Sequence, residues 1–214
     1  MTPSNSTNFI VLFQRFSFVS AMLATLFGLL VLMGWTFNIT LLKSIQPGFA
    51  AVKINTAIAF LLIGISLLLF YRPKDAMQRR RFLAARLLAS IAALIGLLTL
   101  LEYLIGWNIG IDQLLFEEAA TMDATTLPGR MAPTTAFNFL LLGAALILLD
   151  TKKAGEGKSS QILAMIAFVN TLVGFLAYFY HISTFGGVSA YTTTAFYTVI
   201  MFLISSLGVL FARS

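Results

Sequence analysis

The sequence predicts an all-α integral membrane protein of six transmembrane helices, arranged as three repeated helical hairpins. The first observation is composition: 59% of the 214 residues are hydrophobic and 10% are charged, with a mean hydropathy of +0.92. Polar surface this sparse cannot coat a soluble globule, so the solvent is expected to be lipid. The apolar runs do not alternate with polar residues as barrel strands do, and helices are therefore predicted.

Six apolar segments approach or reach the roughly 20 residues that a membrane span needs. They are residues 16–37, 54–71, 87–105, 131–149, 162–182 and 191–212. No basic residue precedes Phe9 and the first run is too long for a signal peptide, so this run is read as a membrane helix. Residues 1–214 are thus expected to form one transmembrane domain, with hairpins over about 10–71, 83–149 and 161–212.

The second observation is a short phrase that opens three of these runs. The copies are Asn55-Thr56-Ala57, Thr134-Thr135-Ala136 and Thr193-Thr194-Ala195, at spacings of 79 and 59 residues. A polar side chain at this place predicts a helix start, because its oxygen can accept an N–H group of the first turn. The repetition indicates one hairpin used three times.

The third observation is the distribution of charge. Basic residues dominate two connections, Arg72, Lys74, Arg79, Arg80, Arg81 and Arg86 in 72–86, and Lys152, Lys153 and Lys158 in 150–158. The positive-inside rule places both connections and both termini in the cytoplasm, as expected for a multi-pass protein of a bacterial inner membrane. The net charge of +6 then needs no nucleic-acid partner. All three phrases face outward, which predicts a pseudo-threefold axis along the membrane normal.

A longer motif resembles a known family. It reads Gly110-Ile111-Asp112-Gln113-Leu114-Leu115-Phe116, then Pro128-Gly129-Arg130-Met131-Ala132-Pro133-Thr134-Thr135-Ala136, then Phe139-Leu140-Leu141-Leu142-Gly143. This combination, strongest over about 100–150, resembles the multi-spanning N-terminal membrane region of bacterial sensor histidine kinases and related signalling proteins. The resemblance implies an input domain that precedes a PAS, kinase or GGDEF output module, and a homodimer formed through the parent protein. The chain itself has no H-box, nucleotide-binding motif or cyclase motif after the last predicted span.

Polar residues near the outer helix ends are the candidate ligand site. Glu102 ends the third span and His181 the fifth, and Tyr103 and Tyr178 take similar places beside them. Ionisable groups at membrane depth are costly and often functional. With the residues Asn55, Thr134, Thr135, Thr193 and Thr194 they predict a polar ring around an outward-facing chamber. The alternative is that these groups only satisfy helix ends and one another.

Aromatic and charged residues complete the candidates. Trp35 and Trp107 each follow a glycine and offer an aromatic wall to a lipophilic ligand such as a quinone or lipid, with packing as the alternative. The residues Asp112, Glu117, Glu118 and Asp123 match no calcium loop and are expected to form a solvated acidic loop. Arg130 is expected to pair with one of these carboxylates or with lipid headgroups, and Lys53 is interpreted as an interface anchor.

The scarcity of histidine and cysteine excludes several kinds of metal and cofactor site. His181 is the single histidine and there is no cysteine, which excludes a haem held by two imidazoles and any thiolate metal site. The cofactor stays undetermined. There is no phosphate loop and no nucleophile placed beside a base, so no enzyme activity is expected in this chain.

Two function classes follow. In the first, the chain is a sensory input domain that detects a small or lipophilic ligand or a membrane state and relays it through the last helix. In the second, three hairpins enclose a path in a small transporter or channel. The scarcity of charges in mid-membrane and the lack of paired broken helices favour the sensor.

Overall fold

The computed structural model describes residues 3–44, 50–71, 78–106, 108, 110, 112, 129–149, 156–179 and 194–212. These residues are helical, without a strand. The helices are α1 (Pro3–Thr36), α2 (Thr40–Lys43), α3 (Ile54–Tyr71), α4 (Gln78–Ile105), α5 (Pro133–Leu148), α6 (Glu156–Phe179) and α8 (Phe196–Phe211). The protein is therefore all-α, as predicted.

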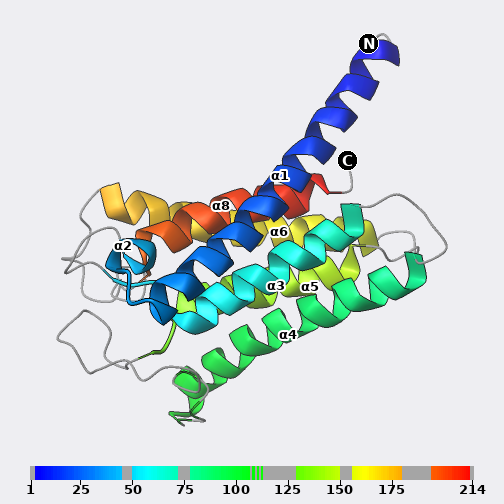
Figure 1. Ribbon diagram of the computed structural model, residues 1–214. Coiled ribbons are helices and arrows are strands. Elements are labelled where there is room, and N and C mark those ends of the chain that lie inside the picture. Colours follow the sequence, from blue (N-terminus) through cyan, green and yellow to red (C-terminus); the bar gives the residue numbers. More distant parts are fainter. Residues whose placement is uncertain are drawn as a thin grey trace.

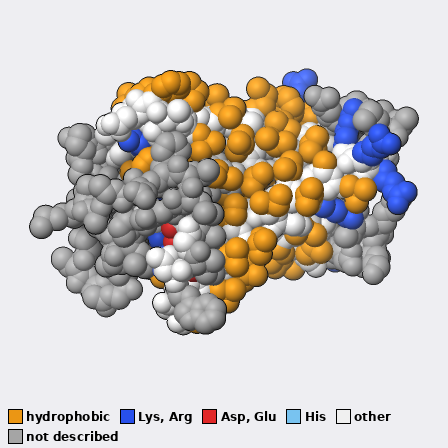
Figure 2. All heavy atoms as spheres, turned by 60° about the horizontal axis from the view of Figure 1, so that its bottom comes forward, with side chains coloured by type: hydrophobic (Ala, Val, Ile, Leu, Met, Phe, Trp, Pro, Cys, Tyr) orange, Lys and Arg blue, Asp and Glu red, His pale blue; other side chains and the backbone are white. Residues whose placement is uncertain are grey.

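The long helices form two concentric groups (Figure 1). The inner helices α3, α5 and α8 contact one another, and each also packs against its preceding outer helix, α1, α4 or α6. Large exposed apolar side chains lie mostly on the outer helices, for example Leu26, Leu87 and Ile166. Figure 2 shows these side chains as a broad hydrophobic band, with Lys and Arg gathered at one end of the visible face. A surface of this kind suits lipid.

Within the described ranges, four helices are long and apolar enough to cross a membrane. The qualifying segments are Phe9–Thr36, Ile54–Tyr71, Gln78–Ile105 and Lys158–Ala177. The apolar helices α5 and α8 have 16 residues each, or about 24 Å of helix against roughly 30 Å of hydrocarbon. Both belong to the inner group, and the described residues just before their first turns, Arg130, Met131 and Ala132 for α5 and Thr194 and Ala195 for α8, are buried.

The predicted boundaries agree best for α3, whose limits are the predicted 54–71. Helix α4 begins nine residues before the predicted span, at Gln78 rather than 87, because its first turns are a polar extension carrying Arg79, Arg80 and Arg81. Helix α8 begins at Phe196, whereas the phrase placed its start near residue 191.

The capping role predicted for the repeated phrase is wrong for α5 and α8. Their N-cap residues are Ala132 and Ala195, and neither start has a side-chain cap. In α5 a proline at the first helical position needs no N–H partner. The Thr134 hydroxyl instead lies 3.1 Å from the Thr194 hydroxyl. Thr134 and Thr194 thus bond to each other across the bundle.

The inner helices meet at three phenylalanine rings. Phe60, Phe139 and Phe202 are each at most 1% exposed, and their ring centroids lie 4.9, 4.7 and 4.7 Å apart. The three phenylalanines are separated by 79 and 63 residues along the chain. The residues whose carbonyls accept the first helical hydrogen bond of each inner helix, Lys53, Ala132 and Ala195, have the same separations. The second and third copies of the phrase are 59 residues apart instead, so the third copy lies four residues, about one helical turn, from the equivalent position.

The outer helices share a spacing of buried residues. These residues are Ser17, Ala21, Ala24 and Gly28 on α1, Ala85, Ala89, Ala92 and Gly96 on α4, and Ser160, Ala164, Ala167 and Thr171 on α6. Small side chains let backbones approach closely in a membrane. A Cβ atom on Gly28 would lie 2.6 Å from the Ala57 carbonyl oxygen, and Gly96 packs in the same way on Ala136.

Serine hydroxyls make hydrogen bonds between neighbouring helices. The Ser66 hydroxyl donates to the Ala85 carbonyl at 2.9 Å, and the Ser160 hydroxyl donates to the Ala145 carbonyl at 2.8 Å. The Ser20 hydroxyl donates to the Ile204 carbonyl at 2.8 Å, which joins α1 to α8 and closes the ring of helices.

Candidate functional site

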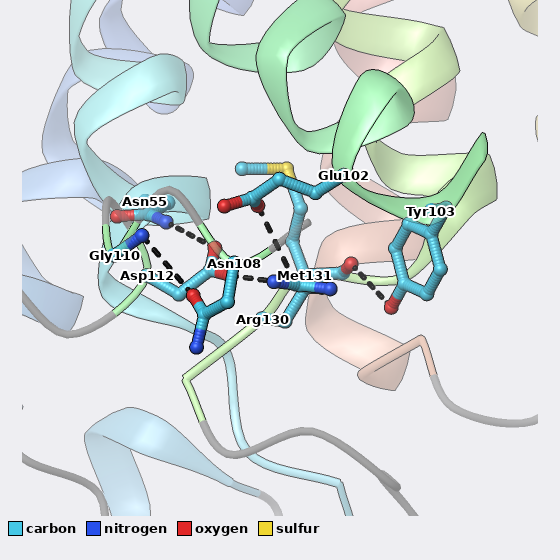
Figure 3. A network of polar contacts seen from close by, with 8 residues as sticks. All are labelled: Asn55, Glu102, Tyr103, Asn108, Gly110, Asp112, Arg130 and Met131. Carbon is cyan, nitrogen blue, oxygen red and sulfur yellow. Dashed lines mark hydrogen bonds and ion pairs between the residues drawn. The ribbon is translucent and has the colours of Figure 1, made fainter. Parts of the chain in front are cut away.

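A buried network of four side chains lies at the end of the bundle where α4 ends and where α3 and α5 begin. The four side chains come from separate parts of the chain. Glu102 lies in the last turn of α4, Asn55 in the first turn of α3, Asp112 on the connection after α4, and Arg130 just before α5. Figure 3 shows the four side chains converging. None is more than 9% exposed. The network therefore joins two helix ends and the long connection.

Arg130 is the centre of this outer network. Its Nε donates to Asp112 Oδ2 at 2.7 Å and lies 3.4 Å from Glu102 Oε2. Asn55 Nδ2 donates to Asp112 Oδ1 at 3.0 Å, so both carboxylate oxygens of Asp112 have partners. One guanidinium thus lies between two buried carboxylates and is held by the shorter of the two contacts.

Burial makes this network sensitive to change. The side chains of Arg130, Asp112 and Glu102 are 5%, 5% and 0% exposed. Removing one partner of a buried ion pair leaves an uncompensated charge and costs about 3–5 kcal/mol. Any event that moved the 106–112 connection would alter the pairing of Arg130, and with it the start of α5.

The chain geometry around the network depends on backbone turns with positive φ. Gly106 ends α4 with φ of 74°, and Asn38 holds the corresponding place after α1 with φ of 54°. Gly110 and Gly129 have φ of 80° and 75°, a conformation that costs glycine little. The amide of Gly110 also donates to the Asn108 side chain at 3.1 Å. These turns bring Asp112 and Arg130 back towards the helix ends.

Two aromatic side chains fasten outer helices to inner helix starts beside the network. Trp35 Nε1 donates to the Val52 carbonyl at 2.9 Å, and the Tyr103 hydroxyl donates to the Met131 carbonyl at 3.1 Å. Cations lie over both rings: Lys43 Nζ is 4.8 Å from the Trp35 ring, and Arg130 is 5.4 Å from the Tyr103 ring. Trp35 thus corresponds to Tyr103 in position and bonding.

The threonines predicted for the same ring belong to a different cluster. Thr134, Thr135 and Thr194 line a pocket between α5, α6 and α8, away from the charged network. Asn138, Asn170 and Thr171 also line this pocket. The expected single chamber is therefore two polar clusters in the described part of the chain, a charged one and an uncharged one.

Several predicted site residues lie outside the described residues. They are His181, Thr193, Trp107, Glu117, Glu118 and Asp123, and the side chain of Tyr178. The places predicted for His181, Tyr178 and Thr193 in the polar ring therefore remain predictions. Among the described residues, Glu102, Tyr103, Asn55, Asp112 and Arg130 do come together.

Two sequence interpretations are wrong. Asp112 was assigned to a solvated acidic loop, but it is 6% exposed because Arg130 and Asn55 surround its carboxylate. Lys53 was interpreted as an interface anchor, but it is 7% exposed. Its backbone carbonyl accepts the first intrahelical bond of α3, from Ala57.

Sequence reasoning missed Asn138, Asn170 and Thr171. An asparagine within an apolar helix was the available signal, since Asn138 stands where the first copy of the repeat has Ala59. The two clusters offer uncharged hydrogen-bond donors and acceptors in one place and an arginine between two carboxylates in the other. Among the described residues, no group of three His, Cys, Asp or Glu side chains could hold a metal ion.

Comparison with known proteins adds no assignment. No protein-family model, curated protein or solved structure matches this chain significantly.

Proposed function

We propose that the chain is the membrane-embedded sensory input domain of a bacterial signal-transduction protein. It spans the inner membrane six times as three hairpins, with both termini in the cytoplasm. A stimulus at the outer end changes helix packing, and α8 carries that change to a cytoplasmic output module. The resemblance of the 110–143 motif to sensor histidine kinases and related proteins motivates the choice.

The observation that carries the proposal is the buried outer network. A receptor needs an element that is stable in at least two arrangements and that links the stimulus to the helices. Arg130 has two carboxylate partners, Asp112 on the connection and Glu102 on α4. A shift of the connection would weaken the first contact and favour the second. The change would reach α5 directly, because Arg130 lies three residues before its first residue.

Repeat geometry supports the three-hairpin arrangement. The inner helices share the phenylalanine positions, the outer helices share a spacing of small buried residues, and Trp35 and Tyr103 make matching bonds. The last turns of α3, α5 and α8 and the first turns of α1, α4 and α6 lie at one end of the bundle in Figure 1. Arg79, Arg80 and Arg81 lie near this end, in agreement with a cytoplasmic assignment.

The packing of the bundle centre weighs against the transporter or channel alternative. A path along the axis between the inner helices would pass through Phe60, Phe139 and Phe202, whose rings are in mutual contact. Opening it would require all three rings to move out of a close-packed core.

The proposal is tested by joining the chain at its C-terminal end to a histidine-kinase transmitter and measuring autophosphorylation in membranes. Asp112→Asn and Arg130→Gln are expected to change the basal rate at least threefold, because each alters the pairing in the outer network. Leu104→Ala is the matched control, since Leu104 is 81% exposed on the same turn of α4 as Glu102.

Two results would overturn the sensor. One is an unchanged autophosphorylation rate in both network variants at equal protein level. The other is substrate flux in liposomes that contain the chain alone, which would establish the transporter instead.

A further inference from the structure

The pocket between α5, α6 and α8 is lined mainly by threonine and asparagine side chains. Its lining is Thr134, Thr135, Asn138, Asn170, Thr171, Gly174, Thr194, Val199 and Phe202. None of these described lining residues is charged. The volume open to water-sized spheres is ≈ 20 Å³, and a single water needs about 10–15 Å³ by this measure. The pocket therefore has room for one small uncharged group, not for a ring.

This polarity is specific to one helix interface. Thr171 takes the place on α6 that Gly28 has on α1 and Gly96 has on α4. On α5, Asn138 stands where α3 has Ala59. The glycines allow close packing of the other two helix pairs, whereas larger polar side chains hold this interface apart.

A hydrogen-bond chain fixes the orientation of the Asn138 amide. The Thr171 hydroxyl donates its one hydrogen to the Ala167 carbonyl at 2.7 Å, so it can only accept from Asn138 Nδ2, at 3.0 Å. Asn138 Oδ1 accepts from Asn170 Nδ2 at 2.9 Å. One of the two Asn138 N–H groups is used in this way, and the described residues provide no partner for the second.

Thr135 supplies a second free donor. It is 2% exposed and lines the same pocket, yet its hydroxyl has no hydrogen bond within the described part of the chain. Thr135 and Asn138 are three residues apart on α5 and so lie on one face of the helix. The pocket thus presents two donors for which the described residues supply no acceptor.

We propose that this pocket binds the carbonyl oxygen of an uncharged lipophilic molecule, with the Thr135 hydroxyl and the second Asn138 N–H as donors. A carbonyl oxygen has two lone pairs and can accept both bonds. Asn170 is half-buried on α6, and Val169 and Val173 near it on this helix are 51% and 49% exposed. A molecule dissolved in the bilayer can therefore reach the site while its remaining atoms stay outside. This inference rests on the sensor proposal and names the ligand class of that sensor.

Quinones and glycerolipid esters both carry such carbonyls, and the experiment separates them. The 214-residue chain is purified in detergent and titrated with decylubiquinone and, in a second arm, with dioleoylglycerol, and bound ligand is counted by native mass spectrometry. One probe is expected to bind with one-to-one stoichiometry and to identify the source.

The test variant is Thr135→Val, which removes the hydroxyl without breaking a hydrogen bond of the described fold. It is expected to weaken binding about fivefold, the loss of one neutral hydrogen bond. The matched control is Thr56→Val: Thr56 has the same place on α3 and the same 2% exposure but does not line the pocket. Its affinity should equal that of the unmodified chain.

The pocket proposal is overturned if neither probe binds one-to-one, or if the two threonine variants bind equally well. These outcomes are independent of the kinase fusion. If the network variants change autophosphorylation in the fusion but neither probe binds, the pocket proposal is refuted and the sensor proposal stands. If a probe binds but the network variants do not change autophosphorylation, the sensor proposal is refuted and the pocket proposal stands.

Discussion

At the scale of single residues, Arg130 is the position on which the outer network depends. It is 5% exposed and lies within 3.4 Å of two carboxylates from different parts of the chain. A charge in this position cannot be removed without leaving its partners buried and uncompensated. The network therefore explains why a basic residue precedes α5 at this position.

Arg130→Gln is expected to lower the free energy of unfolding by about 3–5 kcal/mol, as for other broken buried pairs. Arg130→Glu should be worse, because three carboxylates would then share the site. Thermal unfolding in detergent, followed by fluorescence-detected gel filtration, measures the loss. Arg79→Gln, at an exposed position of α4, is the control. An unchanged melting temperature for Arg130→Glu would refute the pairing.

Elements are held together by small residues and by serine hydroxyls. Ser66 and Ser160 donate to carbonyls across the α3 to α4 and α5 to α6 contacts, at 2.9 and 2.8 Å. The donor lies on the inner helix in one case and on the outer helix in the other. The same interhelical bond is therefore made by different residues, which a comparison of sequences does not reveal.

Ser66→Ala and Ser160→Ala should each destabilise the bundle modestly, by about 0.6 kcal/mol, the average for such bonds between membrane helices. The two effects should add, because the serines belong to separate interfaces. Unfolding of the single and double variants in mixed micelles measures this. A double variant that loses much less than the sum would indicate that the two interfaces are not independent.

On the scale of the whole molecule, the three phenylalanines at the centre decide the packing. Phe60, Phe139 and Phe202 belong to three different helices, and their ring centroids are all within 4.9 Å of one another. Aromatic pairs at these distances add to the gain from burial. The centre of the bundle is thus a closed aromatic core.

Changing Phe60, Phe139 or Phe202 to alanine should cost about 3–5 kcal/mol each, the usual range for a buried phenylalanine. If the three hairpins are equivalent, the three losses should agree within about 1 kcal/mol. Phe137→Ala is the control, since Phe137 lies on α5 but is 38% exposed. Strongly unequal losses would count against the repeat.

The orientation in the membrane is a property of the whole chain and can be read by labelling. The chain has no cysteine, so single cysteines can be introduced without background. Arg80→Cys should react with a membrane-impermeant maleimide only after cells are opened, and Asn108→Cys should react in intact spheroplasts. The reverse pattern would invert the proposed topology.

How much the sequence predicted differs between the fold and the site. Hydrophobic runs located the membrane helices, and α3 matches its predicted limits. The sequence comparison aligned the three copies of the Thr-Ala phrase, whereas the buried phenylalanines mark the equivalent positions at which the inner helices pack. The start predicted for α8 was therefore about one turn too early. The sequence predicted that Arg130 pairs with a loop carboxylate or with lipid headgroups, and the structure shows the carboxylate of Asp112. It did not predict which carboxylate would pair or that Asp112 would be buried, since both depend on how the connection folds back.

The sequence by itself determined that this protein is helical and suited to lipid, because composition and the length of apolar runs act through solvation alone. It also brought Glu102, Asn55 and Arg130 to one end of the bundle, since chain direction alternates from helix to helix. Only the tertiary structure decided which polar groups meet: Arg130 with Asp112 and Glu102, and Asn138 with Thr171 and Asn170. Such contacts depend on helix rotation and on distances of a few ångströms between segments far apart in the chain, which no local pattern encodes.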